Sequence, residues 1–397
     1  MRRIDLKKAQ AARLGTIRDI NRQIVLNYVR EREPISRAEI ARETALQRST
    51  ISTIVDSLQR EGLVEEIGEG ESTGGRRPTM LRLRTAGPIG IGVAINPTLT
   101  TVATNDLAGR VLEEREFATE LDSQKTLGRV IDCINSLLSR TDGTVEAIGV
   151  SLPGLVDPET GTAIYVPYFM WRDLPVAEAI SAGTGLPVIV DNDANSMALA
   201  ELWFGRPEVT YARDFIMVLV AEGVGTGIVF DGQIYRGKRG AAGEFGHMIT
   251  GTHAPVPCSC GNYDCWEAFS SERASIARYK KLCSIGDSEA PHFKELIDRA
   301  LGGEEHARTA IVETALCLGV GISNLIVGFS PEAVVVGGEI ARAWSLIESA
   351  LRETIEHSVR RGLPSAPILP STLGDQPTLR GALSLVLATK FAATVAA

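Results

Sequence analysis

A short segment in the second half of the chain places one histidine and three cysteines within nineteen residues, in the order His-x10-Cys-x-Cys-x4-Cys. These residues are His247, Cys258, Cys260 and Cys265. Three thiolates and one imidazole form the ligand set of a closed, tetrahedral zinc site, which leaves no position for a substrate water. Gly261, directly after Cys260, permits the tight turn that returns the chain toward Cys265. The segment therefore predicts one structural Zn²⁺ per chain, around which this part of the fold must close.

Two alternatives exist for these residues. Three buried cysteines could lie beside an unrelated histidine, or a disulfide could join two of them. The first is disfavoured because the three cysteines lie within eight residues, whereas the others, Cys133, Cys283 and Cys317, are scattered. The second is disfavoured because three neighbouring cysteines leave one without a partner.

Two glutamates flank the predicted metal ligands. Glu244 precedes His247 by three residues, and Glu267 follows Cys265 by two. A metal-anchored loop would hold both carboxylates in fixed positions, which suits the binding of polyol hydroxyls. The alternative is that both are solvated surface carboxylates, which is the usual situation of a single glutamate.

Length and composition limit the class of protein. The chain has 397 residues, of which 44% are hydrophobic, so two or three domains with sizeable cores are expected. No apolar run approaches the length of a bilayer span, and the charged N-terminus lacks the apolar core of a signal peptide. The scattered cysteines fit reduced thiols. The sequence thus predicts a cytoplasmic protein without a membrane segment.

Charge is distributed unevenly along the chain. Residues 1–84 carry 17 Lys and Arg against 12 Asp and Glu, a net charge of +5, whereas the remainder carries 24 against 37, a net charge of −13. A basic part joined to an acidic part predicts that only the first contacts a polyanion. We therefore expect a DNA-binding domain at 1–84, a linker at 85–88, and two lobes at 88–205 and 206–397.

The N-terminal part has the pattern of three short helices. In the first, apolar residues recur at helical spacing: Ile17, Ile20, Ile24 and Tyr28. Ser36 and Glu39 form a capping box before the second helix, a short turn at 43–47 leads to the third, and Gly62 ends it with a left-handed cap. A compact turn between the second and third helices is typical of a helix-turn-helix.

The third helix carries a polar N-terminal cluster: Arg48, Ser49, Thr50, Ser52 and Thr53. Small hydroxyls and an arginine suit phosphates and base edges, so this is the predicted recognition helix. A strand at 63–67, a glycine-rich loop at 68–75 and a strand at 76–84 predict a wing, whose Arg76 and Arg77 could enter a minor groove or contact phosphates. The alternative is a helical dimerisation module with a solvated basic face.

Several runs of residues resemble the ROK family, which comprises repressors, open reading frames and sugar kinases. The segment from Gly243 to Glu267 contains the family's Gly-Glu-x-Gly-His and Cys-x-Cys-Gly-x3-Cys-x-Glu runs. Further family-like runs surround it, at residues 151–157, 191–195, 231–237 and 334–338. The resemblance spans about residues 88 to 397 and implies two actin-like α/β lobes with a cleft between them.

The resemblance also implies a site and a branch of the family. It implies that the zinc ligands are the four His and Cys residues above, and that five residues line a sugar site: Asn192, Asp193, Glu244, His247 and Glu267. The Gly-Gly-Arg-Arg-Pro run at 74–78 resembles the wing of the family's regulators, whereas its kinases lack such a head.

Two turns depart from the pattern of the family's kinases. Ala94 stands where the kinases carry an Asp near Mg²⁺, and Asn96-Pro97 replaces paired glycines, so that Pro97 removes a backbone N–H donor. Glu222 replaces a threonine of the second phosphate loop and would set a negative charge against phosphates. The resemblance therefore implies no catalytic residue and no kinase activity.

Two residues of the expected cleft have more than one interpretation. Asp193 would be the general base of a kinase, would accept a hydrogen bond from a sugar hydroxyl in a regulator, or could cap the following helix. Tyr168 stands where the family usually has a sugar-contacting Asn, and with Phe169 and Trp171 it could stack on a sugar or fill the lobe.

Together these observations predict a sugar-responsive DNA-binding regulator, and they favour a repressor of sugar-use genes. We expect it to bind a double-stranded operator through paired heads, as a homodimer or homotetramer, and a sugar or sugar phosphate in the body. One alternative is a ROK sugar kinase with an appended regulatory head. Another is a sugar-binding protein whose inducer acts through a second protein.

Overall fold

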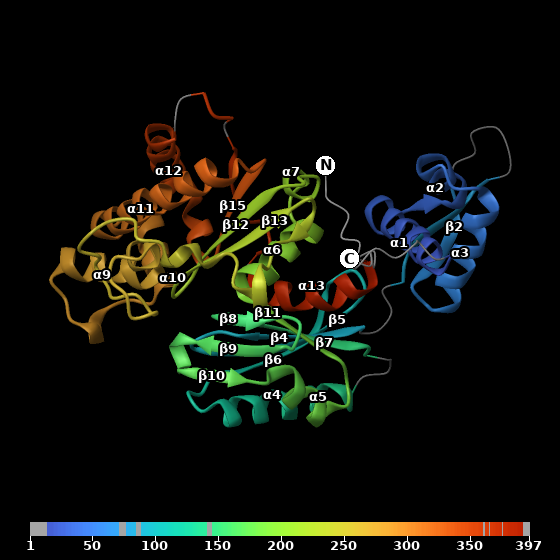
Figure 1. The fold of residues 1–397 in the computed structure, drawn as a ribbon, viewed down its shortest axis with the longest axis horizontal. Helices are drawn as coiled ribbons and strands as arrows, with labels where there is room; N and C mark the ends of the chain where they lie inside the picture. The colour runs from blue at the N-terminus through green and yellow to red at the C-terminus, as the bar shows by residue number, and fades with distance from the viewer. Residues whose placement is uncertain are drawn as a thin grey trace.

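The computed structural model describes most of the chain and shows a small head beside a two-lobed body (Figure 1). The residues that it describes are 14–70, 77–84, 89–140, 145–359, 362–364, 366–374 and 376–391. Arg76 and the expected linker at 85–88 lie outside these ranges, and so does the side chain of Ile17.

Three helices form the head, as the sequence predicted: α1 (Leu14–Arg32), α2 (Arg37–Thr44) and α3 (Arg48–Arg60). The hydroxyl of Ser36 accepts a hydrogen bond from the Glu39 N–H, and the Glu39 carboxylate accepts one from the Ser36 N–H, which confirms the capping box. Gly62 has a φ of 74°, so it provides the left-handed residue after α3.

The buried face of α1 is displaced from the predicted one. Val25, Leu26 and Val29 are fully buried, whereas Ile20 and Ile24 are only half-buried. The helix packs between the rest of the head and the body. The apolar surface of α1 is therefore wider than a single row of residues at helical spacing. The spacing alone does not show which part of that surface is most buried.

A three-stranded sheet completes the head, in the order β1-β3-β2. Its strands are β1 (Ile35–Ser36), β2 (Val64–Glu69) and β3 (Thr79–Leu83). The antiparallel pairing of β2 with β3 confirms the predicted hairpin, although β3 begins at residue 79 and not at 76. The sequence did not predict β1, because a two-residue strand is too short to show alternation.

The first lobe is built on a mixed five-stranded sheet in the order β11-β7-β4-β5-β6. Its strands are β4 (Gly90–Ile95), β5 (Leu99–Asn105), β6 (Val111–Ala118), β7 (Ala147–Leu152) and β11 (Val188–Asn192). A smaller sheet lies beside it, with β8 (Leu155–Asp157), β9 (Thr162–Val166) and β10 (Trp171–Leu174). One face of the large sheet packs its apolar side chains against α4 (Ser123–Leu138) and α5 (Val176–Thr184).

The second lobe repeats this plan with a sheet in the order β14-β13-β12-β15-β16. Its strands are β12 (Phe215–Val220), β13 (Val224–Phe230), β14 (Gln233–Ile234), β15 (Ala333–Gly337) and β16 (Ile368–Pro370). Its helices are α7 (Pro207–Thr210), α8 (Trp266–Ser270), α9 (Glu272–Cys283), α10 (Phe293–Leu301), α11 (Glu305–Phe329) and α12 (Trp344–Ser358). In β12 the even-numbered residues from 216 to 220 pack toward α9, α10 and α11, and the odd-numbered residues from 215 to 219 pack toward α6 (Asp193–Phe204).

Two helices lie between the two large sheets, and we call α6 and α13 (Pro377–Phe391) the interlobe helix pair (Figure 1). A Cβ added to Gly149 of β7 would lie 2.0 Å from the Ala382 carbonyl oxygen of α13, so this strand and helix are in backbone contact. A Cβ added to Gly227 of β13 would lie 2.4 Å from the Ala194 carbonyl oxygen of α6. Glycine is what permits both approaches.

This packing changes the expected division of the body. The sequence assigned the helix after Asp193 to the first lobe and the C-terminal helix to the second. In the structure α13 packs on β4 and β7 of the first sheet, and α6 packs on β12 and β13 of the second. Each of these two helices therefore packs on the sheet of the lobe to which the sequence did not assign it. Local sequence patterns do not reveal this arrangement, because both helices are apolar on several sides.

One described helix, α11, is long and apolar enough to cross a membrane by length and composition alone, contrary to the sequence expectation. Of its most apolar window, 61% is buried inside the structure. Ala310, Ile311, Leu318 and Ile322 lie in the core of the second lobe. Its composition is therefore that of a helix packed on several sides within a lobe.

We predict that Gly149→Ala lowers the free energy of unfolding by about 1–3 kcal/mol, because the added methyl meets the α13 backbone. Gly128→Ala is the matched control, since Gly128 lies within α4 with nothing within 4 Å of an added Cβ. The control should raise the free energy of unfolding by about 0.4–1 kcal/mol. Denaturant unfolding measures both, and equal stability of the two variants would contradict this account.

Candidate functional site

A cavity of about 800 Å³ lies between the lobes, and all five predicted sugar-site residues line it. Asn192 and Asp193 come from the first sheet and the start of α6, whereas Glu244, His247 and Glu267 come from the second lobe. The cavity is within the range of pockets that hold small molecules. The structure brings these residues together, and their role in sugar binding stays a prediction.

Asn192, and not Asp193, caps α6. Its amide oxygen accepts hydrogen bonds from the Ala194 and Asn195 N–H groups at 2.9 and 3.3 Å. Its amide nitrogen donates to the Gly154 carbonyl at 2.9 Å. The Asn192 side chain therefore joins the helix start to the loop after β7, and most of its hydrogen-bonding capacity is used within the protein.

Asp193 is the first residue of α6 and lines the cavity. One carboxylate oxygen accepts a hydrogen bond from the Ala194 N–H at 2.8 Å. Burial, and then the nearby negative charge of Glu244, raise the pKa of Asp193 to about 7. This carboxyl group can therefore either donate or accept a hydrogen bond near neutral pH.

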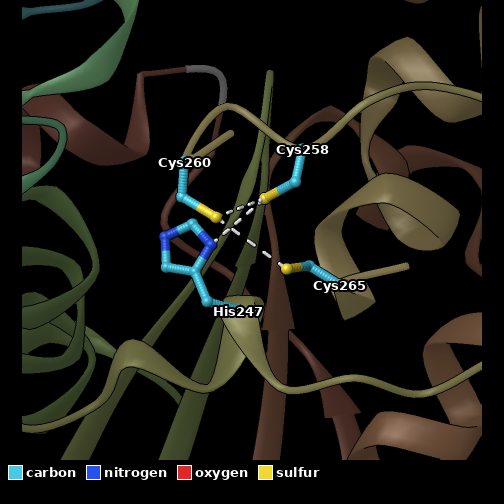
Figure 2. A group of neighbouring side chains, drawn as sticks. All are labelled: His247, Cys258, Cys260 and Cys265. Atoms are coloured by element: carbon cyan, nitrogen blue, oxygen red, sulfur yellow. Dashed lines mark hydrogen bonds between the residues drawn. The ribbon is translucent and has the colours of Figure 1, made fainter. Parts of the chain in front are cut away.

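The four predicted metal ligands converge on one point (Figure 2). Their ligand atoms all lie within 4.8 Å of one another: the Cys258 Sγ lies 3.3 Å from both the Cys260 Sγ and the His247 Nδ1, and the Cys260 Sγ lies 3.9 Å from the Cys265 Sγ. Thiolates at about 2.3 Å from a tetrahedral zinc would be about 3.8 Å apart. The four side chains could therefore hold a metal ion.

Two cysteines of this cluster are buried, and a carboxylate lies beside its histidine. Burial raises the pKa of the Cys258 and Cys265 thiols, so these groups become thiolates only if a positive charge is near. The second ring nitrogen of His247, Nε2, lies 3.5 Å from the Glu244 carboxylate, a partner that orients the ring. Glu244 thus contacts both the cavity and a metal-ligand candidate.

Glu267, the second residue of α8, is buried and accepts hydrogen bonds from the loop that carries Cys258 and Cys260. Its Oε1 accepts hydrogen bonds from the Ser259 N–H at 2.8 Å and the Ser259 hydroxyl at 2.6 Å. The Cys258 Sγ and an Arg273 nitrogen lie 3.3 and 3.4 Å from the same oxygen. A Cβ added to Gly223 would lie 2.4 Å from the other oxygen, Oε2, which leaves no room for a side chain there.

Of the three aromatic residues between the end of β9 and the start of β10, only Tyr168 lines the cavity. Phe169 and Trp171 are buried in the first lobe, with ring centroids 4.4 Å apart, so they fill the lobe. The Tyr168 hydroxyl lies near Glu267, since both would meet a Cβ on Gly223. The Arg273 guanidinium lies 6.0 Å from the Tyr168 ring.

Arg273 and Ser259 contact the candidate site, but the sequence analysis did not single them out. Ser259 stands between two of the metal-ligand candidates, and this position was the available signal. Arg273 follows Glu267 by six residues and also donates to the Glu222 carbonyl at 2.9 Å. Nothing in its local sequence distinguishes it from a surface arginine.

The two turns that depart from the kinase pattern contain Ala94 and Glu222, and both residues line the cavity. Ala94 is buried in an apolar cluster with Leu379 and Leu383 of α13, so no carboxylate faces the cavity from this position. Burial, with the charges of Glu222 and Glu339, raises the pKa of Glu272 to about 8. Gly338 follows Gly337 at the end of β15, has a φ of 93° and lies against the Val220 carbonyl, so the fold itself requires a glycine at this position.

In the head, the N-terminal turns of α3 present the predicted DNA contacts. Arg48, Ser49 and Thr53 are exposed, and Thr50 and Ser52 are half-buried. Arg77 is exposed and lies 4.0 Å from Glu69, whereas Arg76 lies outside the described residues. Arg42 and Gln47, which no sequence pattern indicated, are exposed and border a hollow beside Arg48 that forms only where α2 and α3 pack together.

Comparison with known proteins agrees with this architecture. Residues 90–389 match the ROK family, and residues 24–77 match the MarR family. The xylose repressor of Caldicellulosiruptor bescii is 33% identical over 389 residues, which cover 94% of this chain and 96% of that protein. The DNA-binding transcriptional dual regulator NagC of Escherichia coli is 30% identical over 393 residues, which cover 96% and 95%.

Solved structures match the two parts differently. A ROK family transcriptional regulator, a homolog of the E. coli MLC protein, matches with a TM-score of 0.78 and 27% identity, covering 95% of this chain and 98% of that one. A ROK family glucokinase from Streptomyces griseus, in complex with glucose and AMPPNP, matches with a TM-score of 0.66 and 29% identity, covering 75% and 98%. The chain belongs to the ROK family. Its helix-turn-helix head and ROK body make it a sugar-responsive DNA-binding regulator.

We predict that the stability of Asp193→Asn, relative to the wild type, rises between pH 5 and pH 8. Asp193 has a pKa of about 7 in the fold and about 4 when unfolded. Its stabilising contribution is therefore complete below about pH 4 and is lost as the pH rises through about 7. Asparagine cannot ionise, so it escapes this loss.

Urea unfolding at a series of pH values measures the difference. Asp132→Asn, on the exposed side of α4, is the control for loss of one negative charge. A stability difference for Asp193→Asn that does not change with pH would rule out the raised pKa.

Proposed function

We propose that the protein is a repressor that binds an operator near sugar-use genes and leaves it when a sugar occupies the interlobe cavity. The observation that supports this most directly is the cavity lined by Asp193, Glu244 and Glu267, in a chain whose head has an exposed polar recognition helix. Carboxyl groups arranged around a cavity suit the hydroxyls of a sugar. A sugar that contacts both lobes stabilises one lobe arrangement over another.

The proposed effector is an uncharged monosaccharide. Several carboxyl groups line the cavity: Asp193, Glu222, Glu244, Glu267 and Glu272. The Arg273 guanidinium is already paired with Glu267, and that of Arg342, which also lines the cavity, is paired with Asp298 and Glu339. A phosphate would add two negative charges to this surface, so the phosphorylated form should bind more weakly. Xylose and N-acetylglucosamine are the first candidates, because they appear in the names of relatives.

We further propose that the body has no kinase activity, so that no residue is catalytic. Ala94 offers no carboxylate for Mg²⁺, and Glu222 places an acidic side chain in the half of the cleft that would hold ATP phosphates. The alternative is a sugar kinase with a regulatory head. Asp193 favours it, because a carboxyl of pKa about 7 at a cleft suits a general base. Turnover in a coupled ATP assay with these sugars would support that alternative.

The metal in our proposal is one structural Zn²⁺ held by His247, Cys258, Cys260 and Cys265. It would supply a positive charge that holds the thiolates and fixes the loop carrying Glu267. Cysteine ligands require reducing conditions, which fits a cytoplasmic location. For DNA, we propose contacts from Arg48, Ser49, Thr50, Ser52, Thr53, Arg76 and Arg77, with two heads of a homodimer or homotetramer on one near-palindromic operator.

We predict that the purified protein binds DNA from around its own gene and that one sugar weakens this binding by about 5- to 150-fold. Fluorescence anisotropy at fixed salt, with D-xylose, N-acetylglucosamine, D-glucose and their phosphates, measures the effect. A sugar that strengthens binding would point to an activator or a co-repressor. Equal binding to a random duplex, with and without sugars, would refute the repressor proposal.

The same assay tests the proposed DNA-contacting surface of α3. Arg48→Ala should weaken operator binding. It should also reduce the slope of the logarithm of the binding constant against the logarithm of the salt concentration by about one. Arg60→Ala is its matched control, since Arg60 is also exposed on α3 but lies at the opposite end of the helix. Equal losses in the two variants would move the interface away from the N-terminal turns of α3.

We predict that Cys258→Ser lowers the zinc content from about one ion per chain to well below one and lowers the thermal midpoint. Cys133→Ser, in α4 of the other lobe, should keep the full content. Metal analysis by mass spectrometry, with thermal unfolding before and after a chelator, gives both quantities. Normal zinc in Cys258→Ser would overturn the metal assignment.

A further inference from the structure

The interlobe helix pair connects the cavity to the head. Asp193 at the start of α6 and Pro377 at the start of α13 both line the cavity. At 1.5 Å per residue, α6 extends about 18 Å and α13 about 22 Å. Near their opposite ends, Trp203, Phe204 and Leu387 pack against the hydrophobic cluster that forms the core of the head. Each helix therefore has one end at the candidate sugar site and the other at the DNA-binding domain.

The two helices are fixed to different lobes. In the first lobe, a Cβ on Gly92 would lie 2.6 Å from Leu383 of α13, which adds to the backbone contact at Gly149. In the second lobe, a Cβ on Gly225 would lie 2.9 Å from the Ala194 Cβ of α6, which adds to the contact at Gly227. Interiors packed this closely do not deform continuously. We therefore expect α13 to move with the first sheet and α6 to move with the second.

The helices meet each other over small residues. A Cβ on Gly381 of α13 would lie 2.9 Å from the Ser196 Cβ of α6 and 3.0 Å from the Met197 nitrogen. At Gly381 the two helix backbones approach each other without a side chain from α13 between them, and packed helices can change their relative position by small sliding movements. A change in the angle between the lobes must then appear as a displacement of α6 along or across α13.

The head rests on both helices at once. Val25, Leu26 and Val29 of α1 share one hydrophobic cluster with Leu387 of α13. On the α6 side, the Arg30 guanidinium lies 4.3 Å from the Trp203 ring. The Arg30 side chain is only 14% exposed, so this cation is largely removed from solvent. A displacement of α6 relative to α13 therefore cannot leave both contacts of the head unchanged.

We propose that Trp203 and Arg30 are positioning residues that couple the interlobe cavity to the orientation of the DNA-binding head. A ligand that changes the angle between the lobes shifts the end of α6 relative to the end of α13. The Trp203–Arg30 contact carries this shift to α1, and the recognition helix α3 turns with the head as a unit. This inference rests on the proposed function in one respect, namely that a sugar in the cavity alters operator binding.

The test separates coupling from binding. Trp203→Ala and Arg30→Ala should bind D-xylose, or whichever of the above sugars the wild type answers to, within about twofold of the wild-type affinity. In these variants the sugar should change the operator affinity by less than about twofold, whereas in the wild type it causes the full change predicted above. Because coupling between two ligands is reciprocal, the effect of operator DNA on sugar affinity should disappear with it.

Two controls exclude a merely structural effect. Arg32→Ala removes the same charge from an exposed position of α1 and should keep the full sugar response. Trp203→Phe keeps an aromatic ring beneath Arg30 and should restore most of it. A full response in Trp203→Ala or Arg30→Ala would overturn the proposal. So would a loss of sugar affinity in parallel with the loss of response, because that outcome indicates damage to the body.

A second arm needs no sugar. Gly225→Ala inserts a methyl between β13 and the first turn of α6, and should change operator affinity at least threefold in the wild-type background. In the Trp203→Ala background the same substitution should change it by less than about 1.5-fold. Equal changes in the two backgrounds would overturn the coupling. A wild type that answers to no sugar, combined with a positive result here, would refute the proposed effector and leave the coupling standing.

Discussion

The backbone contact between α6 and α13 at Gly381 is the constraint on which the two-lobed arrangement depends. Each sheet needs apolar cover on two faces, and its inner face is covered by a helix that the chain reaches by crossing between the lobes. Glycines on β4, β7 and β13 let these helices lie directly on the strands. The cavity lies at one end of this layer and the head at the other, so both functional surfaces share one mechanical element.

The cavity acquires its chemistry from a loop with little regular structure of its own. The four His and Cys side chains gather that loop, and their neighbours Glu244 and Glu267 are held against the cavity as a result. Burial, and then the charges of neighbouring carboxyl groups, raise the pKa of Asp193, Glu244 and Glu272. Protonated carboxyl groups can donate hydrogen bonds to neutral hydroxyl groups, which is consistent with the uncharged monosaccharide that we propose as the effector.

Much of the candidate site could be read from residue spacing. The metal-ligand candidates, their flanking glutamates and the start of α6 lie in short, chemically distinctive runs, and the structure brings them together. Tyr168, Arg273 and Ser259 gain their significance from contacts between lobes or across a loop. The cap of α6 was assigned to Asp193 as one possibility, but Asn192 fills it, since two adjacent side chains compete for the same N–H groups. Only the backbone geometry resolves that competition.

The sequence by itself determined the order of the parts, because helix-turn-helix spacing, strand hydrophobicity and the His and Cys run are all local patterns. It did not determine that α13 packs on the first sheet and α6 on the second, nor that the head rests on both. Those contacts join residues up to several hundred positions apart, and both helices are apolar on more than one side. Which sheet each helix packs on depends on how closely its backbone fits against the glycine-containing strands. That fit exists only in the assembled core.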